Sequence, residues 1–175
     1  MTTLPNRVIV YGVTGSGKSS LARRLAERTG IPWHSIDDCI GWNPGWEEVP
    51  AAEQRARAAE LCAGERWIID SMYSSWRELA LSRAELVVAL DYPRWLSLSR
   101  LLRRTLSRCV TRRRICNGNV ESIRQVFSGE SIIRWHFQSF VRKRDRIHGW
   151  AADPSFPILV LKSPRATRRW LAEMT

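Results

Sequence analysis

One stretch decides the fold of this chain: RVIVYGVTGSGKSSLARRLAERTG, residues 7–30. Its first six residues form a short run rich in apolar, β-branched side chains, which is typical of a strand. Apolar residues between Leu21 and Ala26 then fall on one face of a helix, and Gly30 followed by Pro32 is a helix stop signal. The stretch therefore predicts a strand, a glycine-rich turn and a helix, in that order.

The turn has the sequence GVTGSGKS, residues 12–19, and fits the phosphate-loop pattern G-x-x-x-x-G-K-[ST]. Its glycines let successive backbone N–H groups point at a phosphate, and the positive end of the helix dipole faces the same place. In this pattern Lys18 reaches the β- and γ-phosphates of ATP, and Ser19 holds Mg²⁺. A chance match is disfavoured because the motif lies between a predicted strand and a predicted helix. The predicted nucleotide-binding residues are Gly12, Thr14, Gly15, Ser16, Gly17, Lys18, Ser19 and Ser20.

Strands and helices continue to alternate along the rest of the chain. Further strands are predicted at 31–37, 66–70, 86–91 and 156–161, and helices at 50–64, after Pro93, at 131–144 and at 164–174. Such alternation forms a parallel sheet with helices on both faces, a three-layer α/β fold. We therefore predict one domain, residues 1–175, with a five-stranded parallel sheet.

Two of the predicted helices have an apolar face. Leucines recur through the helix after Pro93, and apolar residues in 131–144 lie at helical spacing. The residues expected on these faces are Leu96, Leu98, Leu101, Leu102, Leu106, Ile133, Phe137, Phe140 and Val141.

The composition and charge of the chain indicate its location in the cell and the charge of its partner. The 175 residues are 44% hydrophobic and 26% charged, which indicates a globular protein. No apolar run approaches the roughly 20 residues that span a bilayer, and no signal peptide is evident, so we expect a cytoplasmic monomer or homodimer. Its four cysteines form no CxxC pair, and His34, His136 and His148 lack metal-ligand spacing. The net charge of +11 implies an anionic partner.

Four stretches together carry a family resemblance: GVTGSGKSSLARRLA, HSIDDCIGWNPGW, RWIIDSMYS and LVVALDYPRWLSLSRLLRR. In this order they resemble the small P-loop proteins of the adenylate-kinase-like group, and more narrowly the bacterial DNA topology modulation proteins. The resemblance implies a nucleoside-monophosphate-kinase-type fold with strand order 2-3-1-4-5. It also implies a carboxylate near the acceptor, an ATP- and Mg²⁺-dependent phosphoryl transfer, and a lid over the phosphates.

Asp37 and Asp38 follow the second predicted strand, at the edge where doubly wound sheets bind ligands. The kinases that the chain resembles place a carboxylate here to orient or deprotonate the acceptor hydroxyl, and we assign this role to Asp37. Trp42 and Trp46 would then form a platform for a base or sugar. Alternatively, Asp37 caps the next element and the tryptophans pack as core.

Asp70 ends the third predicted strand, where it would join Ser19 in holding Mg²⁺ through water. The alternative for Asp70 is a simple turn residue. Asp91, after the fourth strand, is expected to cap a helix. Ser71 follows Asp70 where nucleoside monophosphate kinases usually have glycine, which argues against an ordinary nucleoside monophosphate as acceptor.

An arginine-rich segment, about 108–128, lies where these kinases have their lid. We expect Arg112 and Arg113 to stabilise the transferred charge, since guanidinium groups match phosphate oxygens. Contact with a nucleic acid backbone and a solvated basic face are the alternatives. After the fifth strand, Pro164 or Arg165 is placed to pack on the adenine; alternatively, both simply belong to the start of a helix.

Two functions remain open at this stage. The favoured one is an ATP- and Mg²⁺-dependent phosphotransferase that acts on a small nucleotide-like or hydroxyl acceptor. The other is a DNA- or RNA-associated P-loop ATPase with a regulatory role. The small single domain favours the first because nothing is left over for a nucleic-acid module, and the basic excess keeps the second open.

Overall fold

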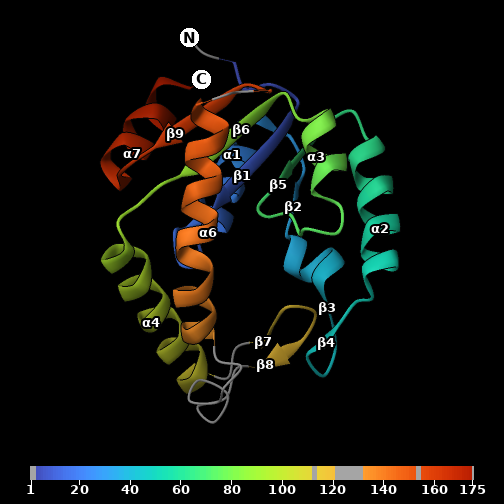
Figure 1. Cartoon of the computed structure of the whole chain (residues 1–175), viewed down its shortest axis with the longest axis vertical. Helices are drawn as coiled ribbons and strands as arrows, with labels where there is room; N and C mark the ends of the chain where they lie inside the picture. The colour runs from blue at the N-terminus through green and yellow to red at the C-terminus, as the bar shows by residue number, and fades with distance from the viewer. Residues whose placement is uncertain (1–2, 112–113, 121–131, 153–154, 175) are drawn as a thin grey trace.

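A five-stranded parallel sheet lies at the centre of the computed structural model, which describes residues 3–111, 114–120, 132–152 and 155–174 (Figure 1). Neighbouring strands pair in parallel throughout this sheet. Across the sheet the strands are β2 (Trp33–His34), β5 (Trp67–Ile69), β1 (Arg7–Gly12), β6 (Leu86–Leu90) and β9 (Ile158–Leu161). Counted along the chain within the sheet, this order is 2-3-1-4-5, which confirms the prediction.

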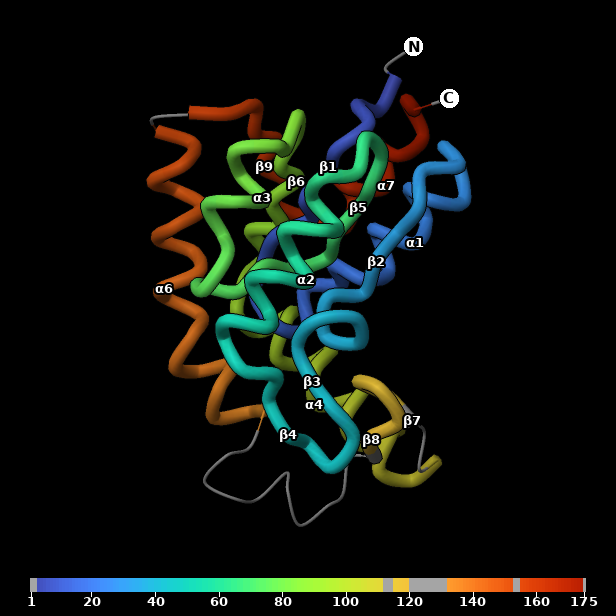
Figure 2. Tube along the Cα trace, turned by 90° about the vertical axis from the view of Figure 1, so that its right-hand side faces the viewer, coloured from blue at the N-terminus to red at the C-terminus, as the bar shows by residue number. Residues whose placement is uncertain are grey.

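Helices cover both faces of the sheet, as the two perpendicular views show (Figures 1 and 2). Their bounds are α1 (Lys18–Thr29), α2 (Ala51–Ala63), α3 (Arg77–Arg83), α4 (Arg94–Thr111), α6 (Ile132–Ala152) and α7 (Pro164–Glu173). One apolar cluster joins the sheet to α1 and α7, and the other joins it to α2, α3 and α6. The molecule is therefore a three-layer α/β domain, as predicted.

The central strand β1 contributes to both apolar clusters because its side chains alternate between the two faces. Val8 and Val10 pack with the helices on one side, and Ile9 and Tyr11 pack with those on the other. All four are buried. Gly30 ends α1 in the left-handed conformation, with φ 66°, and its N–H bonds to the carbonyl of Ala26, so the predicted stop signal is confirmed.

The predicted strand at 31–37 is wrong in its second half. β2 contains only Trp33 and His34, and residues 37–41 form the short π-helical turn η1 (Asp37–Gly41). The π-helical turn is rare and recurs at functional sites. Elements that the sequence did not predict are α3 and two small hairpins, formed by β3 (Trp42–Asn43) with β4 (Glu47–Glu48) and β7 (Arg114–Ile115) with β8 (Asn119–Val120).

The expected apolar faces of α4 and α6 are only partly buried. On α4, Leu101 is buried, whereas Leu106 is 63% exposed. On α6, Phe140 is buried, whereas Phe137 and Val141 are 47% and 54% exposed. Both helices extend past the edge of the sheet (Figure 1), so much of their apolar surface does not reach the main core. No helix in the described ranges is long and apolar enough to cross a membrane.

Candidate active site

The phosphate loop leaves the sheet where β1 ends, between β5 and β6, and leads directly into α1. Gly15 and Gly17 have φ of 84° and 98°, a region that favours glycine. A Cβ on Gly15 would overlap the backbone carbonyl oxygen of Ser97 in α4. The loop therefore needs glycine at Gly15 for two reasons: its backbone conformation and its close approach to α4.

Lys18, the first residue of α1, folds back over this loop. Its Nζ donates a hydrogen bond to the carbonyl oxygen of Val13 at 3.1 Å. Burial lowers the pKa of Lys18, and the carboxylates of Asp70 and Asp37 act in the opposite direction. The predicted phosphate-binding lysine thus lies within electrostatic reach of both predicted carboxylates.

Asp70 and Ser19, the two residues predicted to hold Mg²⁺, lie in contact. Asp70 is buried, and its side chain is hydrogen-bonded to that of Ser19. Its Oδ1 also accepts the backbone N–H of Ile36 at 3.1 Å. Burial raises the pKa of Asp70, whereas these hydrogen bonds and Lys18 lower it. A hydroxyl beside a carboxylate suits Mg²⁺, which prefers oxygen ligands, so these two residues fit the ion.

Asp37 opens the π-helical turn η1, and its side chain is held by a tyrosine. The hydroxyl of Tyr73 donates to Oδ1 of Asp37 at 2.6 Å. Burial and the Asp37 charge raise the pKa of Tyr73, so it remains a neutral donor. Tyr73 also packs so closely on Gly41 that a Cβ there would overlap its hydroxyl. The carboxylate of Asp37 therefore has a tyrosine partner, and no cap hydrogen bond is present at η1.

Asp38, Trp42 and Trp46 belong to the segment that contacts the β7–β8 hairpin. The side chain of Asp38 accepts the backbone N–H of Asn117, in the turn between β7 and β8, at 3.1 Å. Trp42 and Trp46 are half-buried, and their rings meet edge to face at 5.7 Å. The backbone N–H of Trp46 donates to Asn119 Oδ1 at 2.9 Å. This part of the predicted acceptor stretch therefore anchors the β7–β8 hairpin, which lies within the predicted lid segment.

Three cations that we had not assigned to the site lie near the loop. Arg100 Nη1 donates to the carbonyl oxygen of Ser16 at 3.1 Å, and Arg104 is close enough to lower the pKa of Lys18. Lys143 of α6 is half-buried, and burial followed by the charge of Lys18 lowers its pKa to about 7. Arg100 and Arg104 lie one helical turn apart, so spacing along α4 could have paired them. Nothing in the sequence marks Lys143.

Polar contacts hold helix α6 against the end of the sheet from which the phosphate loop leaves. Asp91, after β6, forms an ion pair with Arg144 at 3.1 Å and a hydrogen bond with His148 Nε2 at 2.9 Å. The expected capping role of Asp91 is therefore wrong, because its carboxylate is used to hold α6. The buried ring of His136, near the start of α6, reaches the phosphate loop, with Nδ1 3.0 Å from the carbonyl oxygen of Thr14.

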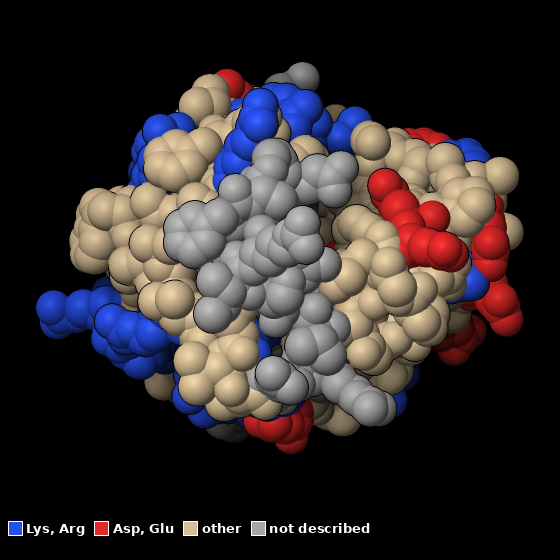
Figure 3. Space-filling view, turned by 90° about the horizontal axis from the view of Figure 1, so that it is seen from below, with Lys and Arg blue, Asp and Glu red and all other residues tan. Residues whose placement is uncertain are grey.

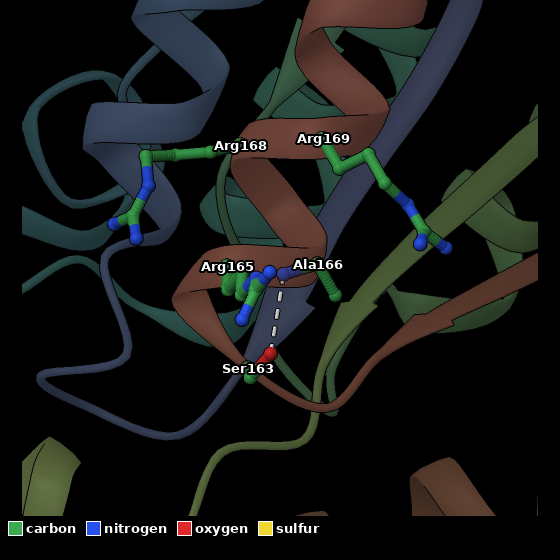
Figure 4. A pocket seen from close by; sticks show the side chains of 5 residues that line it. All are labelled: Ser163, Arg165, Ala166, Arg168 and Arg169. Atoms are coloured by element: carbon green, nitrogen blue, oxygen red, sulfur yellow. Dashed lines mark hydrogen bonds between the residues drawn. The ribbon is translucent and has the colours of Figure 1, made fainter.

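Arg112, Arg113 and Arg165 were also predicted as site residues. Arg112 and Arg113 lie outside the described residues, and so does the second part of the predicted lid, 121–128. Arg165 is exposed in the first turn of α7, where it lines an open depression of about 640 Å³ (Figure 4). Ser163 caps this helix by accepting the N–H of Ala166 at 3.1 Å. A helix start is therefore present, and the contact of Arg165 with adenine stays a prediction.

Charge is unevenly distributed at the lid end of the molecule. Seen from below, Lys and Arg gather mostly on the side of α4, and Asp and Glu mostly on the opposite side (Figure 3). Glu47 and Glu48 of β4 are exposed on the acidic side. On this face, Lys and Arg thus gather on the side of α4, the helix that supplies Arg100 and Arg104 (Figure 3).

Comparison with known proteins shows the fold class. No protein-family model matches this chain, and no curated protein matches it in sequence. Its structure is similar to a gluconokinase from Sinorhizobium meliloti 1021, with a TM-score of 0.57 and 17% identity over 98% of this chain and 94% of that one. It is also similar to a sugar kinase from Janibacter sp. HTCC2649, with a TM-score of 0.53 and 19% identity over 97% and 94%.

The chain accordingly shares its α/β fold, with the five-stranded parallel sheet, with these two kinases. At these low identities the likeness concerns the fold. The narrower resemblance to the DNA topology modulation proteins is not supported, since no family model matches.

Proposed function

We propose that this protein is an ATP- and Mg²⁺-dependent phosphotransferase that acts on a hydroxyl group of a small, sugar-like acceptor. The observation that carries the proposal is the position of Lys18 within reach of both Asp70 and Asp37. The carboxylate of Asp70 lies beside Ser19, and that of Asp37 is open to solvent. Phosphoryl transfer needs this division between a metal site and an acceptor site, because most of its catalysis is alignment and charge stabilisation.

In the proposed reaction the acceptor oxygen attacks the γ-phosphorus of ATP, and the bond from phosphorus to the β–γ bridging oxygen breaks. Asp37 aligns the attacking hydroxyl and receives its proton. Lys18 and the loop N–H groups hold the phosphates. Ser19 and Asp70 would hold Mg²⁺, whose charge would offset that of the phosphates.

The remaining cations would stabilise charge on the transferred group. Arg104 and Lys143 both lie near Lys18, from α4 and α6 respectively. Arg112 and Arg113 retain their proposed lid role, which follows from their position in the sequence. A further proposed contact is that of Arg165 with the adenine.

Two observations favour a sugar-like acceptor over a nucleoside monophosphate. Tyr73 lies against Gly41 and Asp37, on the acceptor side of the site, where an acceptor nucleotide would need room. The solved structures with a similar fold include a gluconokinase and a sugar kinase. Lys143, close to Asp37, adds a cation that suits an acidic acceptor such as a sugar acid.

The test is ADP release from ATP and Mg²⁺ with a panel of acceptors: sugars, sugar acids, nucleosides, nucleoside monophosphates, duplex DNA and water. Lys18→Ala serves as the blank. Stimulation by a sugar or sugar acid, with a phosphorylated product in mass spectrometry, is the expected result. Stimulation by a nucleoside monophosphate would overturn the acceptor class. Stimulation by DNA alone would replace the kinase proposal with the nucleic-acid-associated ATPase.

A further inference from the structure

The phosphate loop is held from outside by side chains of two helices that are distant from it in sequence. In a trans peptide the carbonyl of one residue and the N–H of the next point in opposite directions. Fixing a loop carbonyl on the outer side therefore directs the following N–H inward. Phosphate loops bind their ligand through such inward N–H groups, so a side chain that holds a carbonyl also orients a phosphate-binding donor.

The first such side chain is His136, which is fully buried near the start of α6. Its Nδ1 lies 3.0 Å from the carbonyl oxygen of Thr14. Because a carbonyl oxygen only accepts, Nδ1 must carry the hydrogen. The buried Nε2 has no hydrogen-bond partner among the described residues, and burial lowers the pKa of the ring. His136 is therefore neutral, with its hydrogen on Nδ1 and aimed at the peptide that precedes the N–H of Gly15.

The second side chain is Arg100 in α4. Its Nη1 donates to the carbonyl oxygen of Ser16 at 3.1 Å. This carbonyl belongs to the same peptide group as the N–H of Gly17. The guanidinium group lies 5.5 Å from the ring centre of Tyr92, and the hydroxyl of Tyr92 is 2.5 Å from that of Thr167. The arginine is thus itself held in place by a ring that is fixed to α7.

We propose that His136 and Arg100 are positioning residues that hold the carbonyls of Thr14 and Ser16 and thereby aim the N–H groups of Gly15 and Gly17 at the bound phosphates. The inference rests on the nucleotide-binding part of the proposed function and is independent of the acceptor. It assigns a role to α4 and α6 beyond packing, because these two helices set the shape of a loop that lies between β1 and α1.

The direct test measures the affinity for ATP and Mg²⁺ by calorimetry in His136→Leu and His136→Asn. Leucine fills a similar volume without a donor, whereas the Nδ2–H of asparagine lies close to the position of the histidine Nδ1–H. We expect about a tenfold loss of affinity in His136→Leu and recovery of most of it in His136→Asn. The control is His148 on the same helix, which contacts Asp91 rather than the loop. His148→Asn is therefore expected to leave the affinity for ATP unchanged.

Two outcomes would overturn the role of His136. One is a folded His136→Leu variant, checked by circular dichroism, that binds ATP within about twofold of the wild type. The other is a nitrogen NMR spectrum of the wild-type protein in which the buried ring carries its hydrogen on Nε2. The spectrum needs neither a variant nor activity, so it decides the matter even if the leucine variant does not fold.

Arg100→Gln provides a second measurement at a less buried position, with a similar expected loss of affinity for ATP. An unchanged affinity there would remove Arg100 from the proposal. Lys18→Ala separates this inference from the proposed function. If the wild type itself fails to bind ATP, the proposed function fails. If the wild type binds, Lys18→Ala does not, and the His136 and Arg100 variants bind normally, only the positioning role fails.

Discussion

The two sides of the candidate site are built in different ways. On the nucleotide side, β1, the phosphate loop and the start of α1 place Lys18 and Ser19 within one continuous stretch of chain. On the acceptor side, Asp37 depends on Tyr73, which comes from the segment after β5. Lys143, near both sides, comes from α6. The comparison teaches that local chain geometry brings Lys18 and Ser19 together on the proposed nucleotide side, whereas the proposed acceptor side is assembled from separate segments.

The largest effect is expected on the nucleotide side, from Lys18→Ala. Loss of the lysine removes the cation that the loop directs at the phosphates, so we expect ATP binding and turnover to fall by about a thousandfold or more. Calorimetry with ATP and ADP release would measure this. Lys162→Ala, which removes an exposed lysine after β9, is the matched control. Retention of ATP affinity in Lys18→Ala would show that the loop does not bind phosphate.

The next effect lies on the acceptor side, in Asp37→Asn. The amide keeps the shape but cannot take a proton, so we expect turnover to fall by about a hundredfold while ATP affinity is unchanged. Steady-state kinetics would measure turnover, and calorimetry on the same preparation would measure ATP affinity. Asp145→Asn, at an exposed position of α6, is the control. Loss of the folded circular dichroism signal in Asp37→Asn would instead indicate a structural role.

Tyr73→Phe tests whether the acceptor side depends on a contact between segments. Removing the hydroxyl takes one hydrogen bond from the Asp37 carboxylate, and we expect turnover to fall by about tenfold. In the Asp37→Asn background the same substitution should have much less effect, because the contact already lacks the charged acceptor. Equal effects in both backgrounds would show that Tyr73 does not act through Asp37.

The smallest effect concerns Lys143, where stability and activity are expected to move in opposite directions. Burial lowers its pKa to about 7 from the ordinary value of 10.5, so the folded protein carries a penalty for the charged form. Lys143→Met should therefore stabilise the free protein by about 1 kcal/mol at pH 7 and reduce turnover.

The pH dependence of that difference has a definite sign. The penalty is fully present below pH 7 and disappears as the pH rises towards 10.5, where the unfolded chain also loses its proton. The stability advantage of Lys143→Met should thus shrink between pH 7 and pH 10, as thermal unfolding would show. Lys162→Met provides the baseline for an exposed lysine. A variant less stable than the wild type at pH 7 would mean that Lys143 forms a net favourable contact.

Two predicted site residues were placed at strand ends, and only one of those strands ends where we expected. Asp70 follows a strand that ends where the apolar run ends, and it lies beside Ser19 as predicted from position. Asp37 was placed at the end of a strand, but that strand stops at His34 and a π-helical turn intervenes. β-branched composition does not predict where pairing with β5 stops, because pairing depends on the partner strand.

Helical periodicity predicted the positions of α4 and α6 but not which residues they bury. Phe137 and Val141 fit an apolar stripe, yet they are exposed, while His136 on the same helix is buried against the phosphate loop. A helix that extends beyond the sheet has its buried face set by whatever it meets there. Histidine carries no sequence signal for such a place, and from the sequence we noted only that His136 lacks metal-ligand spacing.

The sequence by itself determined the fold class and the phosphate loop, and its family resemblance implied the strand order. The fold class and the loop follow from apolar runs, glycine positions and the spacing of Lys18 and Ser19, all of which act over short distances along the chain. Only the tertiary structure decided which other groups reach the loop: Arg100, Lys143 and His136 come from helices far away in sequence. Their position depends on how α4 and α6 pack across the edge of the sheet, and packing of this kind is a property of the assembled domain rather than of any local pattern.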